Sequence, residues 1–350
     1  MKKIIHYAKK ILPWVFALII FIYLFHLYPL PKVLKAISYV NLWSFGAFVL
    51  GYFLFIYVID SLVFTYAFRK YGYTVHLKDI FLARAVTYLI MIINYPASQV
   101  AFAYYLNRRY QIPVFQAMGV FLLIIFIDLL WIINLALVGS FFQQQLVMGL
   151  DIGHTVRSFA LAAYIFTFIW LAFWRRWPQK ILGRPLFRWR FLEKQMGRQS
   201  FRVFQETKVK DMLILAVMRI PIHFTIIISM YVILLTFGVH IPFTKVLGNV
   251  PIVFFIGTLP ITPGGLGTTN AAMVELLYPY VTGSIFSTGQ ITPQELIFAA
   301  TLLWMFANYI LKTVFGTFTL RKVSKHLFEL PPEKVEEKME KQAAHLGGNI

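Results

Sequence analysis

The chain has 350 residues, of which 59% are hydrophobic and only 13% charged, and its formal net charge is +19. Soluble domains carry about 25% charged residues, so this composition excludes an ordinary water-soluble protein. Cysteine is absent, which excludes disulfides, thiolate metal sites and cysteine nucleophiles. The basic residues lie in short segments between long apolar runs, which favours anionic lipid headgroups over nucleic acid as their counter-charge.

Long apolar segments recur along the chain, and about 20 such residues are enough for a helix to cross the hydrocarbon core of a bilayer. The first segment follows four lysines but has no cleavage site of small residues, so it is interpreted as a retained anchor helix. The pattern predicts an all-α polytopic integral membrane protein. The eight candidate segments are residues 11–30, 41–68, 85–106, 114–140, 158–174, 212–238, 246–282 and 295–320.

Basic residues indicate the orientation, because loops rich in lysine and arginine stay on the cytoplasmic side. The N-terminus and the loop 175–210 are both rich in these residues, which places both in the cytoplasm. A full crossing by residues 85–106 would put Arg108 and then this loop outside. The conflict disappears if 85–106 is a re-entrant hairpin that breaks near Asn94 and Pro96, where the proline lacks a donor and Asn94 can satisfy freed backbone groups.

The second half of the chain has a similar interruption. Residues 246–282 are too long for one span and are broken between Thr262 and Gly267, which predicts a second re-entrant hairpin, entered from outside. The series helix, helix, hairpin, helix then occurs twice with opposite orientation, in halves of about 1–140 and 158–325, as in transporters built from inverted repeats. The expected fold has about six full transmembrane helices and two broken hairpins in an inner (cytoplasmic) membrane, with both termini and a charged tail at 326–350 in the cytoplasm.

The two breaks also predict a polar site, because non-helical backbone at membrane depth is tolerated only where it is buried in protein or lines a wet cavity. In the second hairpin three glycines permit positive φ and close approach, and a helix starting near Thr268 would direct free N–H groups at the break. An anionic headgroup or phosphate is the expected guest. The alternative is that the glycines only permit a tight turn and close helix packing.

The second break also carries a family resemblance. The stretch Gly257-Thr-Leu-Pro-Ile-Thr-Pro-Gly-Gly-Leu-Gly267 resembles the signature of the lysylphosphatidylglycerol synthase transmembrane-region family, also called flippase-like. Pro96 before an aromatic-rich helix, the pair Arg108-Arg109 and Asp128 inside the next span fall where that family has them. The resemblance covers about residues 5–325 and implies a membrane protein that handles lipids.

The chain departs from the family pattern at positions that are usually charged. Ser98-Gln99 stand where Gly-Glu is usual, Ile127 stands where Arg is usual, and Asn270 stands where Glu is usual. The resemblance therefore does not imply, for this chain, a mechanism that relies on those charges. Family members that synthesise the lipid add a large soluble aminoacyl-transfer domain, and this sequence ends shortly after its last span, so lipid aminoacylation by this chain alone is not expected.

Ionisable side chains inside membrane spans are costly to bury and are functional candidates by default. Asp128 either pairs with Arg219 or lines a cavity, and Glu275 is expected at the cavity. Lys312 is expected to snorkel to the interface. His223 is expected to be a packing residue, because the histidines show no metal-ligand spacing. The full set of intramembrane ionisable candidates is Asp60, Asp128, Arg219, Glu275 and Lys312.

The expected function is binding or translocation of a lipid or lipid-linked anionic headgroup, with membrane lipids as partners. No cofactor, metal site or catalytic constellation is recognisable, so an enzyme is not expected. One alternative is a non-transporting scaffold for a separately encoded lipid- or glycan-modifying enzyme. The other is a membrane enzyme on a polyprenyl phosphate, with Asp128 or Glu275 as base. The candidate cavity residues are Asn94, Pro96, Ser98, Gln99, Asp128, Arg219, Thr262, Pro263, Gly264, Gly265, Gly267, Asn270 and Glu275.

Overall fold

The computed structural model describes residues 2–142, 146–147, 149–176, 203–204, 206–259, 261–262 and 265–328. Within these ranges the regular structure is helical, apart from one antiparallel pair of two-residue strands, β1 (Leu146–Val147) and β2 (Leu150–Asp151). The described residues contain five helices that are long and apolar enough to cross a membrane, or six if one bent pair is counted as a span. The predicted all-α polytopic architecture is confirmed.

The helices that qualify as spans coincide with segments predicted from hydropathy. Their exposed faces carry large apolar side chains, such as Phe166 and Phe168, which are 68% and 76% exposed. Such faces are stable against hydrocarbon, and the backbone of a helix satisfies its own polar groups there. These helices are α3 (Leu42–Lys70), α6 (Val114–Ser140), α7 (Ile152–Arg176), α11 (Val209–Thr236) and α14 (Pro293–Phe328).

The bent pair is formed by α1 (Lys2–Leu27) and α2 (Leu30–Ile37), whose axes differ by 79°. The sequence does not predict α2, because its eight residues are too few for a span. A proline in the first turn needs no hydrogen-bond donor, and Val33 and Ala36 are buried. Lys32 Nζ donates to the carbonyl oxygen of Gln290 at 2.6 Å, which ties α2 to the segment before α14.

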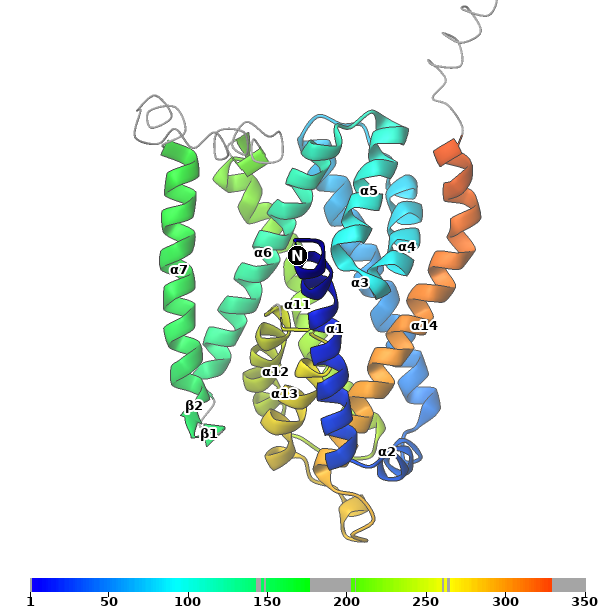
Figure 1. Ribbon diagram of the computed structural model, residues 1–350, viewed down its shortest axis with the longest axis vertical. Helices are drawn as coiled ribbons and strands as arrows, with labels where there is room; N and C mark the ends of the chain where they lie inside the picture. The colour runs from blue at the N-terminus through cyan, green and yellow to red at the C-terminus, as the bar shows by residue number, and fades with distance from the viewer. Residues whose placement is uncertain are drawn as a thin grey trace, which may run out of the picture. The chain divides into compact units, whose positions relative to one another are not determined.

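The first predicted hairpin is present as α4 (Leu77–Ile93) and α5 (Tyr95–Tyr110), which lie side by side in Figure 1. The break falls at Asn94, as the sequence predicts. Its backbone is extended, and its Oδ1 accepts a hydrogen bond from the N–H of Ala97 at 2.8 Å. The open end is closed by an ion pair of 3.2 Å between Arg109 Nε and Asp79 Oδ2. Insertion of this hairpin into the bilayer stays a prediction.

The second hairpin consists of α12 (Phe243–Thr258) and α13 (Thr268–Leu277), and α1 lies beside α13 (Figure 1). The break between these helices is where the sequence predicts it. Gly265 and Gly267 have φ of +74° and +80°, which glycine adopts without a steric penalty. Pro263 and Gly264 lie outside the described residues. Two short 3-10 turns, η3 (Tyr278–Tyr280) and η4 (Ser284–Phe286), follow α13.

The chain forms two compact units that interleave along the sequence. α1, α2, α7, α11, α12 and α13 belong to the first unit, α4 and α5 to the second, and α3, α6 and α14 contribute residues to both. The first unit comprises Met1–Asp60, Ile124–Arg188 and Lys208–Leu311, and the second comprises Ser61–Leu123, Trp189–Thr207 and Lys312–Ile350.

Each unit has its own core. In the first, residues of α11, α12, α13 and α14 such as Leu234, Val250 and Phe298 are fully buried. In the second, four phenylalanines pack with ring centroids 5.1 to 5.8 Å apart, mostly edge to face. The four rings belong to Phe64, Phe68, Phe102 and Phe121.

Candidate functional site

Four ionisable side chains from three membrane-spanning helices meet in the first unit. Arg219 Nη1 donates to Asp60 Oδ1 at 2.6 Å, and Arg219 Nε and Nη2 donate to the two carboxylate oxygens of Asp128 at 2.7 and 2.6 Å. His223 Nε2 lies 3.0 Å from Asp128 Oδ1. We call Asp60, Asp128, Arg219 and His223 the Arg219 cluster.

The helices explain how these groups come together. Arg219 and His223 are four residues apart on α11, so they share one face, which α3 and α6 approach with Asp60 and Asp128. The planar guanidinium matches the two oxygens of Asp128, the arrangement in which a charged pair best offsets its loss of hydration. Asp128 thus pairs with Arg219 and also lines a cavity, which differs from the predicted cavity between the two hairpin breaks.

That cavity, of about 210 Å³, lies between α6, α11 and α12. Its polar end is formed by Asp128, Arg219 and His223. The Asp128 side chain is 21% exposed, against 9% for Arg219 and 7% for His223, so the carboxylate is the most accessible charged group. The remaining walls are apolar and consist of Ile132, Leu135, Ile222, Ile226, Ile227, Pro251 and Phe254.

Trp131 supports this site from α6. Its indole N–H donates to the carbonyl oxygen of Ala216 on α11 at 2.9 Å, and its ring stacks on His223 with 6.4 Å between the centroids. The contact ties α6 to α11 one helical turn away from Asp128 and limits how the imidazole can turn. The orientation of His223 toward Asp128 is therefore set by packing as well as by its hydrogen bond.

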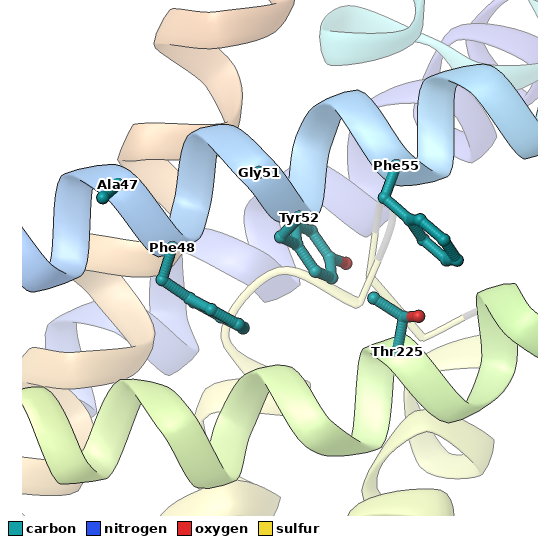
Figure 2. Close-up of a pocket in the computed structure, with 6 residues that line it drawn as sticks. All are labelled: Ala47, Phe48, Gly51, Tyr52, Phe55 and Thr225. Carbon is teal, nitrogen blue, oxygen red and sulfur yellow. The ribbon is translucent and has the colours of Figure 1, made fainter.

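A second hollow is an open groove of about 440 Å³ between α3 and α11, shown in Figure 2. Thr225 lies two residues after His223 on α11, so it presents a different face of the helix from the Arg219 cluster. Its hydroxyl already donates to the carbonyl oxygen of Pro221 at 2.6 Å. A Cβ on Gly51 would meet nothing within 4 Å, which leaves the groove open. The lining residues are Ala47, Phe48, Gly51, Tyr52, Phe55 and Thr225.

In the first hairpin, Ser98 and Gln99 are buried within the second unit, whereas Pro96 is exposed. Ser98 Oγ donates to the carbonyl oxygen of Tyr95 at 2.6 Å, and Gln99 Nε2 donates to Ser98 Oγ at 3.4 Å. Gln99 Oε1 has no hydrogen-bond partner within the described part of the chain. The hairpins belong to different units, so the predicted common cavity stays a prediction.

In the second hairpin, the polar side chains form hydrogen bonds within the protein and the glycines allow close packing. Asn270 Oδ1 accepts from the N–H of Gly267 at 3.3 Å, and Asn270 Nδ2 donates to Thr301 of α14 at 2.9 Å. A Cβ on Gly267 would lie 2.8 Å from Cγ2 of Ile20 on α1. These contacts support the alternative in which the glycines permit close packing.

The other residues of this turn show the same pattern. Thr262 Oγ1 lies 3.1 Å from Thr268 Oγ1, and a Cβ on Gly265 would lie within van der Waals overlap of the Thr269 hydroxyl, at 2.4 Å. Glu275, expected at the cavity, is exposed on α13 and is not among the residues that line the cavity beside the Arg219 cluster.

Two residues have roles that the sequence does not predict. His223, expected only to pack, contacts Asp128, and its spacing of four from Arg219 is the signal that could have indicated this. Lys312 Nζ lies 5.9 Å from the ring centroid of Tyr88 on α4, within the second unit. Arg84 lies over the same ring at 5.1 Å from its centroid, so two cations lie near one aromatic ring.

The open end of the first hairpin carries a further charged contact. The Tyr110 hydroxyl donates to Asp79 Oδ2 at 2.5 Å, beside the Arg109 ion pair. Burial, and then this hydrogen bond, raise the pKa of Tyr110 to about 12. The phenol therefore stays protonated at neutral pH and remains a donor. Among the described residues, no group of three or more acidic or histidine side chains is arranged to hold a metal ion.

The fold and site define a multi-pass α-helical membrane protein with a buried charge cluster beside a cavity whose other walls are apolar. Residues 10–316 match the family model described as the lysylphosphatidylglycerol synthase TM region. The chain belongs to this family, as its Pro-Gly-Gly-Leu-Gly motif predicts. No curated protein and no solved structure matches the chain.

Proposed function

We propose that the protein binds and translocates a membrane lipid or lipid-linked anionic headgroup in a flippase-like manner. The observation that carries this proposal is the cavity of about 210 Å³ with Asp128, Arg219 and His223 at one end and apolar side chains elsewhere. A polar end with apolar walls is the chemistry that a headgroup and the start of its acyl chain require. Charged groups kept inside membrane spans mark substrate or ion pathways.

The groove between α3 and α11 supports the lipid part of the proposal. Its rim includes Phe55, which is 44% exposed on a helix apolar enough to cross the membrane. In the bilayer such a groove faces acyl chains, so it offers a second apolar surface to the hydrocarbon of a bound lipid. Membership of the lysylphosphatidylglycerol synthase TM region family agrees with a lipid substrate.

Lipid movement in liposomes tests the proposal. Purified protein would be reconstituted with fluorescent anionic or zwitterionic lipids, and the transfer of each between leaflets measured. Ile226→Trp fills the cavity from α11 and is expected to abolish transfer of the anionic lipid. Leu213→Trp is the matched control, because Leu213 is 61% exposed on the same helix and lines no part of the cavity.

The result that would overturn the proposal is a folded wild-type protein that transfers neither lipid. That outcome would favour the scaffold for a separately encoded lipid- or glycan-modifying enzyme. Transfer of the anionic lipid at the wild-type rate by a folded Ile226→Trp protein would mean that the cavity is not the path.

A further inference from the structure

We infer that the Arg219 cluster is a proton-binding site, and that proton uptake at His223 is what admits the anionic headgroup to the cavity. The inference rests on the proposed function and adds a coupling ion to it. It begins from the charges of the cluster. Asp60 and Asp128 both accept hydrogen bonds from the one guanidinium of Arg219, so with a neutral imidazole the cluster has one net negative charge. An imidazolium brings the cluster to neutrality.

The geometry gives the proton a definite position. An ionised carboxylate can only accept, so His223 Nε2 carries the hydrogen in its 3.0 Å contact with Asp128 Oδ1. The added proton is taken up from hydronium of the aqueous solution, which leaves water, and forms a new N–H bond at Nδ1. Asp128 keeps its charge throughout, because both of its oxygens also accept from Arg219, at 2.7 and 2.6 Å. The product is an imidazolium paired with a carboxylate.

Within the described part of the chain, three helices place charged groups around His223. α6 presents Asp128 and Trp131 to it, α11 presents Arg219, and α3 presents Asp60 through Arg219. α12 contributes Pro251 and Phe254 to the cavity walls. The one ionisable residue of α12, Lys245, lies over the ring of Tyr280 at 4.7 Å from its centroid.

The charge state decides what the cavity can hold. In the unprotonated cluster the most accessible charged group is the Asp128 carboxylate, which repels a phosphate in a medium of low dielectric constant. In the protonated cluster the net charge is zero, and His223 gains a second donor. Proton and anionic headgroup therefore bind with positive coupling, and each raises the affinity of the site for the other.

Trp131 provides a readout that does not depend on lipid transfer. A protonated imidazole quenches the fluorescence of an indole in contact with it, and the two rings stack with centroids 6.4 Å apart. Protein in zwitterionic nanodiscs would be titrated between about pH 5 and 8, where imidazoles ordinarily change charge. A pH-dependent component of tryptophan emission is expected in the wild type and lost in both Trp131→Phe and His223→Gln. His154→Gln, at an exposed position of α7, is the control that keeps it.

Lipid transfer would be measured over the same pH range in liposomes. Transfer of the anionic lipid is expected to rise as the pH falls in the wild type, and to become independent of pH in His223→Gln. An emission component that persists in His223→Gln would overturn the proton site. Transfer that is independent of pH in the wild type would overturn the coupling and leave the proposed function intact. A His223-dependent emission component without transfer of any lipid would overturn the proposed function and support the proton site.

Discussion

Arg219 of α11 binds both carboxylate oxygens of Asp128 of α6, through Nε at 2.7 Å and Nη2 at 2.6 Å. A third donor of the same guanidinium, Nη1, reaches Asp60 of α3 at 2.6 Å. One side chain thus joins three membrane-spanning helices. Arg219 is the counter-charge of both aspartates within the cluster. A substitution of Arg219 is therefore expected to affect both of them.

Replacing Arg219 by methionine is expected to lower the free energy of unfolding by about 3–5 kcal/mol, because two carboxylates whose side chains are only 7% and 21% exposed lose the guanidinium beside them. Arg219→Lys keeps the charge but cannot form the paired contact with Asp128, so an intermediate loss is expected. Unfolding of the purified protein by denaturant in detergent would give both values.

The matched control is Arg157→Met, which removes a guanidinium that donates to the carbonyl oxygen of Ser140 at 3.0 Å, outside the cluster. Adding Asp60→Asn and Asp128→Asn to the Arg219→Met protein should recover part of the loss, because the two negative charges that Arg219 offsets are then gone. Equal unfolding midpoints for Arg219→Met and Arg157→Met would contradict the importance assigned to the cluster.

Most of the fold follows from local properties of the sequence. α6 runs from Val114 to Ser140, as its hydropathy predicts, because a continuous apolar run after Pro113 defines both ends. The break at Asn94 follows from proline chemistry and from a side chain that can cap the next helix. α2 is not predicted, because its eight amphipathic residues are too few to be recognised as a membrane span.

The candidate site was predictable only in part. Pairing of Asp128 with Arg219 follows from the cost of leaving either charge alone in a membrane. The additional contacts of Asp60 and His223 depend on how α3, α6 and α11 rotate about their axes, and hydropathy contains no such information. For the same reason the sequence could not decide that Asn270 and Gly267 serve the packing of the second hairpin, which the contacts with Thr301 and Ile20 indicate.

A close approach of two helices in the first unit gives a second prediction. A Cβ on Gly139 of α6 would lie 2.3 Å from the carbonyl oxygen of Gly248 on α12, so Gly139→Ala forces two backbones apart. A loss of about 1–3 kcal/mol is expected, as for other overpacked sites. Gly46→Ala on α3 is the control, because its new Cβ meets nothing within 4 Å. Thermal unfolding in detergent should separate the variants, and equal midpoints would contradict the close approach.

Tyr110 gives a prediction about alkaline pH. Its pKa in the folded protein, about 12, exceeds the ordinary value of 10.0. Protonated Tyr110 therefore stabilises the first hairpin fully below about pH 10. This contribution is lost as the pH rises through the folded value. Hydrogen exchange of α4 and α5 would detect the change as an accelerating opening. In Tyr110→Phe the opening should be faster already at neutral pH and should lose this alkaline step. An unchanged pH profile in Tyr110→Phe would exclude the Tyr110–Asp79 contact as its cause.

The absence of cysteine from the chain makes the predicted orientation directly testable. Lys35 of α2 and Lys78 of α4 are both exposed, and the charge rule places the first outside and the second in the cytoplasm. Lys35→Cys is therefore expected to react with a membrane-impermeant thiol reagent added to intact cells, whereas Lys78→Cys should react only after the cells are opened. The reverse pattern of labelling would mean that the protein has the opposite orientation in the membrane. Reaction of both in intact cells would place both residues outside, with an even number of crossings or none between them. That result would contradict the topology that requires a re-entrant first hairpin.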